Sequence, residues 1–401
     1  MGPHKILLLE GIHQIAVETL EKANIEVHRE LTAFSNSELK EKINKYDAVG
    51  IRSKTHISKD IFESCTNVKS IGCFCIGTNQ VDLDTANQYG IPVFNAPYSN
   101  TRSVAELVIS LMVSLSRKIF DRSRKAHDGI WDKSAAGSNE VRGKTLGIIG
   151  YGHIGTQLSI LAESMGLNVQ YYDVIKKLPL GNANATEQLN DLLSTSDFVS
   201  LHVPETEQTK NMIGSSELSK MKKGSYLINA SRGSVVDIKA LSESIKSEHL
   251  AGAAVDVYPK EPKSNKESFT SDLQGLPNVI LTPHIGGSTE EAQYNIGIEV
   301  ATSLIGYLAK GQSIGATNFP NIDVPARDGG HRLVNIHNNV PGVLGEINGI
   351  VSKYGANINR QYLSTDNSIG YLIMDIDVKD SKSLKQDVML LPTSIRTRLL
   401  S

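Results

Sequence analysis

Three short segments in the second half of the chain each carry one side chain suited to acid–base chemistry or anion binding. They are residues 229–233 with Arg232, residues 256–262 with Glu261, and residues 282–288 with His284. Each follows a short apolar run that predicts a strand. Because ligands of doubly wound sheets bind outside the carboxyl ends of the strands, we expect all three side chains to face one crevice. A guanidinium, a carboxylate and an imidazole gathered there could bind an anion and move a proton.

Each of these side chains also has an ordinary explanation when it is taken alone. Arg232 could be a surface ion-pair partner, Glu261 a solvated loop acid, and His284 a histidine satisfied within its own turn. The spacing by itself does not decide between the catalytic interpretation and these ordinary ones.

A glycine motif in the middle of the chain indicates a nucleotide site. The apolar run 146–149 turns directly into Gly-x-Gly-x-x-Gly, formed by Gly150, Gly152 and Gly155, and the next predicted strand, 169–173, ends at Asp173. Such glycines let the backbone approach a pyrophosphate at the N-terminus of the following helix. Asp173 can accept hydrogen bonds from ribose hydroxyls and would repel a 2′-phosphate, which favours NAD over NADP. For His153 we expect the backbone N–H to matter more than the imidazole.

Strands and helices alternate before this motif. Apolar runs predict strands at 6–9, 46–52, 70–76 and 92–95, separated by helical stretches such as 14–22. This pattern is typical of a parallel, flavodoxin-like sheet. The stretch from 103 to 117 is apolar almost all round and predicts a buried helix.

The region after residue 144 repeats the alternation. The first predicted strand of this region begins at 144, and the other five lie at 169–173, 198–201, 225–229, 253–255 and 279–281. Six strands with helices between them make a complete Rossmann sheet. A long helix over 288–308 can then return the chain to the first domain. We therefore expect a substrate-binding domain, residues 1–99 and 288–318, with an NAD domain, 100–287, inserted into it.

The last part of the chain has a different pattern. Residues 315–330 hold Pro320, Pro325, Gly329 and Gly330, so we place a linker at 319–330. From 331 to 401 the order is strand, helix, two strands, helix and strand, with the first helix over 341–354. This βαββαβ order predicts a ferredoxin-like module.

Composition limits the classes of protein that fit. The chain has 401 residues, 40% hydrophobic and 21% charged, with a formal net charge of −2. It is long enough for two or three domains and carries no block of one charge sign, which argues against nucleic-acid and membrane partners. Cys65, Cys73 and Cys75 lack zinc-site spacing and fit reduced thiols of a cytoplasmic protein.

Several of these motifs together carry a family resemblance. They are residues 71–82 (IGCFCIGTNQVD), Asn95-Ala96-Pro97, the glycine motif and the three segments around Arg232, Glu261 and His284. From about Ile6 to the C-terminus the chain resembles the D-isomer-specific 2-hydroxyacid dehydrogenases, and its tail looks like an ACT domain. The resemblance implies NAD-dependent oxidation of 3-phospho-D-glycerate to 3-phosphohydroxypyruvate, the first step of phosphorylated L-serine biosynthesis.

The resemblance also implies roles for individual residues. Arg232 would hold the substrate carboxylate and the oxygen at C2, and His284 would remove the hydroxyl proton as hydride leaves C2 for the nicotinamide. Glu261 would orient His284 and stabilise its charged form. No metal is needed. Asp256 would lie near the nicotinamide amide, and the remaining residues expected around the cofactor are His153, Ile154, Ala230, Ser231, Ile285, Gly286 and Gly287.

Substrate recognition is expected mainly from the first domain. Backbone amides and cations around 52–54, 77–79 and 100–102 suit a carboxylate and a phosphate, so the candidates are Arg52, Ser53, Gly77, Asn100 and, in the loop around Trp131, Lys133. Some relatives carry an arginine about where Cys73 falls. This chain does not, so Arg52 and Lys133 are left to hold the phosphate.

The tail resembles modules that bind amino acids where two tails meet. Asn339 is near the expected N-cap of the helix and Pro341 suits its first turn, which an ordinary well-capped helix also explains. By resemblance His337, Asn339 and Asn357 would contact L-serine. This implies feedback inhibition by L-serine in a homo-oligomer, with a tetramer expected.

Two alternatives remain at this stage. The first is another D-2-hydroxyacid dehydrogenase, reducing glyoxylate, hydroxypyruvate, 2-oxoglutarate or a branched keto acid. The second is an NAD-sensing, corepressor-like binding protein that keeps this fold. The serine-type tail argues against both.

Overall fold

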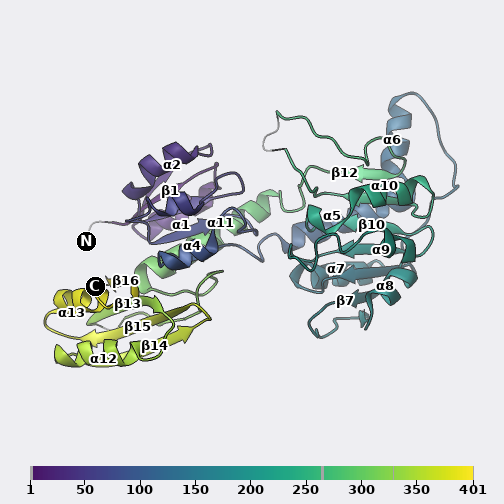
Figure 1. Ribbon diagram of the computed structural model, residues 1–401. Helices are drawn as coiled ribbons and strands as arrows, with labels where there is room; N and C mark the ends of the chain where they lie inside the picture. Colours follow the sequence, from purple (N-terminus) through teal and green to yellow (C-terminus); the bar gives the residue numbers. More distant parts are fainter. Residues whose placement is uncertain (1–2, 263–265, 328, 401) are drawn as a thin grey trace. The chain divides into compact units, whose positions relative to one another are not determined.

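The computed structural model describes residues 3–262, 266–327 and 329–400. The chain forms two compact units, one of Met1–Ser99 with Gln293–Ser401 and one of Asn100–Ala292 (Figure 1). Both units contain parallel sheets with helices against them, which confirms the α/β class.

The first unit opens with a five-stranded parallel sheet in the order β2-β1-β3-β4-β5, the flavodoxin-like order expected from the sequence. The strands are β1 (Lys5–Leu8), β2 (Glu26–Arg29), β3 (Ala48–Ile51), β4 (Ser70–Cys73) and β5 (Val93–Phe94). The helices are α1 (Gln14–Lys22), α2 (Asn36–Lys42), α3 (Lys59–Phe62) and α4 (Leu83–Gln88), with a 3₁₀ turn at Ile43–Lys45. Strand β2 was not predicted, because no residue in it is fully buried and it therefore lacks an apolar run.

The same unit ends with a four-stranded antiparallel sheet in the order β14-β15-β13-β16. Its elements are β13 (His331–Asn338), α12 (Val343–Lys353), β14 (Asn357–Thr365), β15 (Ile369–Asp377), α13 (Ser381–Met389) and β16 (Ser394–Leu400). This confirms the predicted βαββαβ module. One face of the sheet packs Leu333 and Met374 against Ile347 of α12 and Leu384 of α13.

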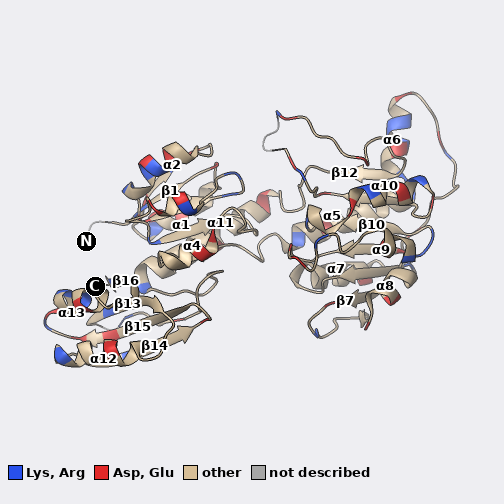
Figure 2. Cartoon of the chain, viewed as in Figure 1, with Lys and Arg blue, Asp and Glu red and all other residues tan. Residues whose placement is uncertain are grey.

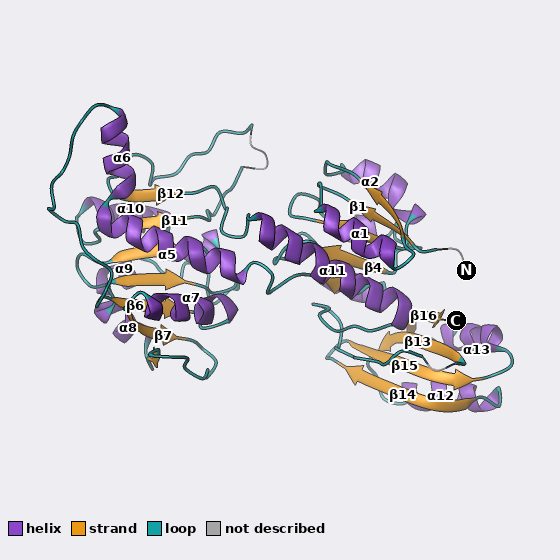
Figure 3. Cartoon of the chain, turned by 180° about the vertical axis from the view of Figure 1, so that it is seen from behind, coloured by secondary structure: helices purple, strands orange, loops and turns teal. Residues whose placement is uncertain are grey.

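Helix α11 (Glu290–Lys310) shares one hydrophobic core with both sheets of this unit (Figure 3). Val300 and Leu304 of α11 belong to the same cluster as Ile6 of β1 and Tyr371 of β15. The described residues of the predicted linker, 319–327 and 329–330, form no helix or strand. Phe319 and the neighbouring apolar residues Ile322 and Val324 are nevertheless at most 6% exposed and join that cluster. The linker is therefore packed into the core and is not a loose tether.

The second unit holds a seven-stranded parallel sheet in the order β12-β11-β10-β9-β6-β7-β8. Its strands are β6 (Thr145–Ile149), β7 (Asn168–Tyr172), β8 (Asn184–Ala185), β9 (Phe198–Leu201), β10 (Tyr226–Asn229), β11 (Gly252–Val255) and β12 (Val279–Leu281). The strand order reverses beside β6, as in Rossmann sheets. The sheet has one strand more than predicted, because β8 is only two exposed residues long and leaves no apolar signal.

The helices of this unit are α5 (Thr101–Arg117), α6 (Ile119–His127), α7 (His153–Ser164), α8 (Leu189–Thr195), α9 (Ser215–Lys220) and α10 (Ile238–Lys246), with a 3₁₀ turn at Gly233–Val235. Helix α5 buries Val104, Val108, Leu111 and Met112 among other residues. Arg102, Glu106, Ser110 and Arg117 are exposed and the other residues that are not buried are half-buried, so the helix is buried on one face and not all round as predicted.

Acidic and basic side chains are mixed on the surface elements, as on α2 in Figure 2, where both signs occur within seven residues. Among the described residues, no helix combines the length and the apolar character needed to cross a bilayer.

Candidate active site

The three chemistry-bearing segments follow three neighbouring strands. β10, β11 and β12 lie side by side, and their last residues are in register, with Asn229 paired to Val255 and Val255 to Leu281. The segments that follow therefore leave the sheet at one edge, the carboxyl edge where ligands of this fold bind. This register brings the loops of Arg232, Glu261 and His284 together within the second unit.

Glu261 and His284 form a direct pair. The Nδ1 atom of His284 lies 2.9 Å from Oε2 and 3.1 Å from Oε1 of Glu261. Because an ionised carboxylate can only accept, Nδ1 carries the hydrogen and the other ring nitrogen, Nε2, keeps its lone pair. The histidine side chain is 52% exposed and the glutamate 35%, so Nε2 is available to a substrate. This arrangement suits a general base with an orienting carboxylate.

Close backbone contact brings the Arg232 loop to the Glu261 turn. A Cβ atom on Gly233 would lie 2.0 Å from the carbonyl carbon of Tyr258, so only glycine allows this approach. The N–H of Tyr258 in turn donates to Oε1 of Glu261 at 3.1 Å. Arg232 and Glu261 are therefore fixed relative to each other through main-chain atoms.

Asn229 holds the Arg232 loop from within the sheet. It is fully buried, its Nδ2 donates to the Arg232 carbonyl at 3.0 Å, and its Oδ1 accepts from the N–H and hydroxyl of Ser231. The guanidinium itself donates through Nη1 to the Ser231 carbonyl at 2.7 Å. These bonds shape the turn from inside and leave the outer part of the guanidinium fork for an anion.

Asp256 shapes the loop that carries His284. Its carboxylate is 1% exposed and accepts from the Thr282 hydroxyl at 2.6 Å and from the N–H groups of Ile285 and Gly286, both at 2.8 Å. His284 has a φ of 55°, a left-handed conformation that is uncommon for a side chain of its size. Asp256 therefore stabilises the conformation of the loop that carries His284. Its buried negative charge also acts electrostatically on the His284 ring.

The contact between Glu261 and His284 shifts the pKa of each side chain. The hydrogen bond that His284 donates to Glu261 raises the pKa of His284 above its usual value, against the opposing effect of partial burial, and the charges of Glu261 and Asp256 add to the rise. Burial acts to raise the pKa of Glu261, but the bonds from His284 and the Tyr258 N–H outweigh it and lower that pKa. The protonated imidazole and the ionised carboxylate stabilise each other.

The glycine motif has the geometry of a dinucleotide loop. Gly150 has a φ of 93°, and a Cβ there would lie 2.5 Å from the His202 carbonyl oxygen. A Cβ on Gly155, in the first turn of α7, would lie 2.3 Å from the Gly150 carbonyl oxygen. Among the described residues other than its two chain neighbours, no atom lies within 4 Å of the same point on Gly152, the N-cap of α7. Two glycines are thus required by the fold, and the third leaves open room at a helix N-terminus, where a pyrophosphate fits.

Asp173 follows the end of β7 and is tied to this loop. Its Oδ2 accepts from the Tyr151 N–H at 2.8 Å and its Oδ1 from the Ile175 N–H at 2.9 Å. Each oxygen retains a further lone pair for a ribose hydroxyl. His153 and Ile154 open α7, so their backbone N–H groups belong to its first turn, as expected for His153. Ala230, Ser231, Ile285, Gly286 and Gly287 all lie in the loops after β10 and β12.

The predicted substrate residues are divided between the two units. Arg52, Ser53 and Gly77 belong to the first unit, where they follow β3 and β4, and Asn100 and Lys133 belong to the second. Asn100 is the N-cap residue of α5 and Lys133 is exposed. The backbone amides after β3 were expected to bind substrate, but those of Arg52, Lys54 and Thr55 already donate to the Glu10 carboxylate. The side chains of Arg52 and Ser53 remain for a ligand.

The predicted serine residues are not gathered in one place within the module. His337 is buried and its Nδ1 lies 2.9 Å from Oδ1 of Asn335, while burial lowers its pKa. Asn339 is exposed and donates to the Asp366 carbonyl at 2.6 Å. Asn357 pairs with Asp377, whereas His337 pairs with Gly370. These two positions are seven residues apart on β15, about 24 Å at strand spacing.

The expected capping role of Asn339 is wrong. The N-cap of α12 is Gly342, with a φ of 96° and no side-chain hydrogen bond, and the helix begins at Val343. Asn339 lies three residues before this N-cap. Its side-chain amide instead donates to the Asp366 carbonyl in the turn between β14 and β15.

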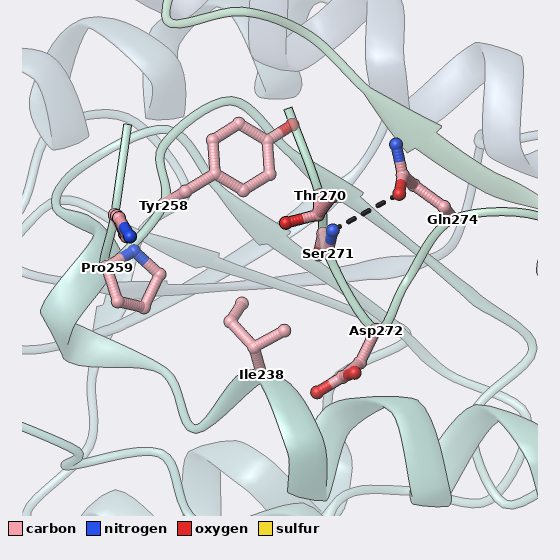
Figure 4. A pocket seen from close by; sticks show the side chains of 8 residues that line it. Ile238, Tyr258, Pro259, Thr270, Ser271, Asp272 and Gln274 are labelled. Atoms are coloured by element: carbon pink, nitrogen blue, oxygen red, sulfur yellow. Dashed lines mark hydrogen bonds between the residues drawn. The ribbon is translucent and has the colours of Figure 1, made fainter. Parts of the chain in front are cut away.

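A cavity of about 340 Å³ lies beside the catalytic loops, in the second unit (Figure 4). It is lined by Ile238, Tyr258, Pro259, Lys260, Thr270, Ser271, Asp272 and Gln274. The Ser271 N–H already donates to Gln274, and the Tyr258 hydroxyl donates to the carbonyls of Val255 and Thr282. The lining includes none of Arg232, Glu261 and His284, so the cavity is separate from the catalytic set.

Sequence reasoning gave no role to Asn229, Gly233, Tyr258 or Glu10. Asn229 and Gly233 lie on either side of Arg232 in the segment 229–233. An asparagine and a glycine so close together indicate a tight turn, and this pattern could have predicted their structural role. Glu10 ends an apolar run and is followed by glycine, which indicates a turn. The sequence does not indicate which backbone N–H groups the Glu10 carboxylate accepts from.

Comparisons with known proteins agree with this geometry. The model of the D-isomer specific 2-hydroxyacid dehydrogenase NAD-binding domain matches residues 109–286, and the AHAS small subunit-like ACT domain model matches residues 333–396. D-lactate dehydrogenase from Aquifex aeolicus, solved with NAD and lactic acid, has a TM-score of 0.68 at 26% identity, covering 79% of this chain and 100% of that one.

The chain belongs to the D-isomer specific 2-hydroxyacid dehydrogenases and is an NAD-dependent oxidoreductase. Its full-length relatives are more specific. The D-3-phosphoglycerate dehydrogenase of Escherichia coli K12 is 55% identical over 401 residues, which cover 99% of this chain and 97% of that protein. That of Dictyostelium discoideum is 51% identical over 396 residues, again 99% of this chain and 97% of that protein.

Proposed function

We propose that the enzyme oxidises 3-phospho-D-glycerate to 3-phosphohydroxypyruvate with NAD, the first step of the phosphorylated route to L-serine. The observation that carries the proposal is the Glu261–His284 pair, with Nδ1 to Oε2 at 2.9 Å, in register with the Arg232 loop. Similarity over almost the whole chain to proteins named D-3-phosphoglycerate dehydrogenase supports this substrate.

The proposed mechanism rests on three side chains. Arg232 holds the substrate carboxylate and the C2 oxygen with its planar fork. Neutral His284 accepts the C2 hydroxyl proton at Nε2, and Glu261 stabilises the imidazolium that forms. In the reverse direction protonated His284 returns that proton to the C2 oxygen. NAD, when bound, supplies the hydride acceptor.

The chain offers NAD a fitting site. The open space at Gly152 and the first N–H groups of α7 suit the pyrophosphate, and Asp173 suits the ribose diol of the adenosine half. Ala230, Ser231, Asp256, Gly286 and Gly287 are assigned to the nicotinamide half, because their loops are those of the catalytic residues.

Following the family resemblance, we assign substrate binding to Arg52, Ser53, Gly77, Asn100 and Lys133, with Arg52 and Lys133 for the phosphate. The positive charges of Arg52 and Lys133 compensate the phosphate charge, and both side chains are at least partly exposed. We accordingly assign residues 1–99 and 288–318 to substrate binding, 100–287 to NAD binding, and 331–401 to regulation, with 319–330 joining them.

The test is a steady-state assay of NADH formation with 3-phosphoglycerate and NAD. The expected result is turnover with 3-phosphoglycerate at a kcat/KM well above the values for reduction of glyoxylate, hydroxypyruvate or 2-oxoglutarate with NADH. A higher kcat/KM for one of these keto acids would replace the proposed substrate, and NAD binding without turnover of any of them would favour a binding protein.

We also propose that the ACT module binds L-serine and lowers activity. His337 and Asn339 lie at one end of the sheet and Asn357 at the other, so one serine can meet all three only if Asn357 comes from a second copy of the chain. Strand β14 supports such pairing, because it is a nine-residue edge strand whose residues are all exposed or half-exposed. We therefore propose that the protein is a homo-oligomer. Following the family resemblance, we also propose that this oligomer is a tetramer and that it is located in the cytoplasm.

Regulation is tested with Asn357→Ala and Asn339→Ala, each assayed with and without L-serine. Both variants should keep their kcat and lose inhibition, because neither residue belongs to the catalytic loops. Ser352→Ala, at an exposed position of α12, is the matched control and should remain inhibited. Full inhibition of both asparagine variants would place the effector elsewhere.

A further inference from the structure

Glu10 is a buried carboxylate that the catalytic mechanism does not use. It follows β1, is 9% exposed, and has a φ of 62°, in the left-handed region. A glutamate at such a backbone position is strained where a glycine would not be, so its side chain must be held by favourable contacts. Among the described residues, none of the ion pairs within 4 Å involves Glu10.

Three backbone donors satisfy this carboxylate. Its Oε1 accepts from the N–H groups of Arg52 at 3.1 Å and Thr55 at 2.8 Å, and its Oε2 accepts from the N–H of Lys54 at 3.0 Å. Backbone N–H groups of one short loop that converge in this way form a nest-like anion-binding concavity. Here the nest after β3 is filled by the protein's own carboxylate, whose charge is balanced by these dipoles rather than by an ion pair.

The opposite side of the loop is held by Gln80. This residue is 5% exposed, and its Nε2 donates to the Arg52 carbonyl at 2.9 Å. The backbone of Gln80 also accepts from the Ile57 N–H at 2.8 Å. Both the N–H and the C=O of Arg52 are thus fixed by buried side chains, while the Arg52 side chain is half-exposed and Ser53 is exposed.

From this arrangement we infer that Glu10 is a positioning residue for substrate binding: it holds the loop of residues 52–55 so that the Arg52 side chain is aimed at the anionic substrate. The inference rests on the proposed substrate role of Arg52. Glu10 itself touches no substrate, so it acts on the KM for 3-phosphoglycerate and leaves the chemical step to His284.

The direction in which the KM for 3-phosphoglycerate changes distinguishes a positioning role of Glu10 from a simple effect of its charge. A nearby negative charge repels an anionic substrate, so removing it would lower the KM for 3-phosphoglycerate. Glu10→Gln removes the charge but also sets an NH₂ group against a backbone donor, which loosens the loop. We expect the KM for 3-phosphoglycerate to rise about tenfold, with kcat and the KM for NAD within about twofold of wild type.

Glu10→Asp keeps the acceptors on a shorter stem and should recover part of the loss. Glu30→Gln, at an exposed position of the same unit, removes an equal charge and should leave the KM for 3-phosphoglycerate unchanged. In an Arg52→Ala background, Glu10→Gln should add little to the KM, because its effect passes through Arg52.

The deciding experiment measures these kinetic constants together with residue-resolved hydrogen exchange of the wild type. In the wild type the amides of Arg52, Lys54 and Thr55 should exchange slowly although two of these residues are not buried. Fast exchange there would overturn the inference even if Glu10→Gln failed to fold. An unchanged or lower KM in Glu10→Gln, or an equal rise in Glu30→Gln, would also overturn it. If Arg52→Ala leaves the KM unchanged, the assignment of Arg52 to the substrate fails instead, and slow exchange would still show that Glu10 holds the loop.

Discussion

Both carboxylate oxygens of Glu261 lie within 3.1 Å of Nδ1 of His284. The pair therefore fixes the ring tautomer as well as its orientation, and leaves the lone pair of Nε2 for the proposed role as base. It also raises the pKa of His284. Oxidation needs the neutral ring, so the rate of oxidation should rise with pH through a pKa above 6.5, while reduction should fall over the same range.

Glu261→Gln tests this coupling. The neutral amide removes the main cause of the raised pKa, so the acid limb of kcat/KM for oxidation should move to lower pH, with kcat at its optimum falling about tenfold or more as the imidazolium loses its partner. The measurement is a pH profile of both enzymes. A limb that stays at the wild-type pH would show that another group titrates.

The same pair links activity to stability. The folded-state pKa of His284 is raised, so its contribution to stability is complete below about pH 6.5 and is lost as pH rises through the folded pKa. The pKa of Glu261 is lowered, so its contribution is present above its usual value and is lost as pH falls through the folded one. Activity in oxidation therefore increases in the pH range where this pair stabilises the fold less.

Gly152→Ala and Gly155→Ala should separate binding from folding. A Cβ on Gly152 meets no atom within 4 Å, so Gly152→Ala should keep its thermal midpoint and raise the KM for NAD about tenfold. A Cβ on Gly155 would lie 2.3 Å from the Gly150 carbonyl oxygen, so Gly155→Ala should also lower the thermal midpoint. Calorimetry with NAD kinetics checks both. An unaffected KM for NAD in Gly152→Ala would remove the pyrophosphate from this loop.

Asp173→Ala should relax the preference for NAD. The change removes the ribose acceptor and the repulsion of a 2′-phosphate, and it also releases the Tyr151 and Ile175 N–H groups. We expect a higher KM for NAD and a rise in the NADP to NAD ratio of kcat/KM. Glu187→Ala, at an exposed position of the same unit, is the control. An unchanged ratio would show that Asp173 does not meet the ribose.

Asp375→Asn should destabilise the first unit. Asp375 and Arg332 form a two-bond ion pair at 2.6 and 2.7 Å with side chains 8% and 1% exposed, and Arg332 also donates to the Lys310 carbonyl at the end of α11. Breaking a buried pair from one side costs about 3–5 kcal/mol. Asp387→Asn, whose partner Lys353 is 73% exposed, should cost less than about 1 kcal/mol. Denaturant unfolding gives both values, and equal costs would contradict the pair's structural role.

The sequence predicted those parts of the fold that leave an apolar pattern. The strand carrying Ile148 is buried on both faces and the helix carrying Ile347 on its apolar face, as their patterns indicate, and both were found. Strand β2, with no fully buried residue, and the two-residue β8 leave no such pattern and were missed. Short exposed strands are held by neighbours that a local pattern does not contain.

The relation between the tail and the rest of its unit could not be predicted for a similar reason. Prolines and glycines around Pro320 and Gly329 indicate a linker, but Phe319 packs edge-on against Tyr371 and joins a core shared with β1. Removing the whole tail would expose that core, so single substitutions such as Asn357→Ala give a cleaner test of regulation.

The candidate residues of the site could be picked out from the sequence, but the residues that support them could not. His284 and Glu261 are reactive types at strand ends, whereas Asp256 and Asn229 act through bonds to backbone groups that only the fold brings near. Glu10 is the clearest case, since its partners at Arg52, Lys54 and Thr55 are more than forty residues away in the chain.

The most direct test of the account is the turnover of His284→Ala with 3-phosphoglycerate and NAD, measured beside NAD binding by the same protein. The account predicts a kcat lower by about two to four orders of magnitude, with the dissociation constant for NAD within about threefold of wild type. Turnover at the wild-type rate would contradict the assignment of His284 as the base.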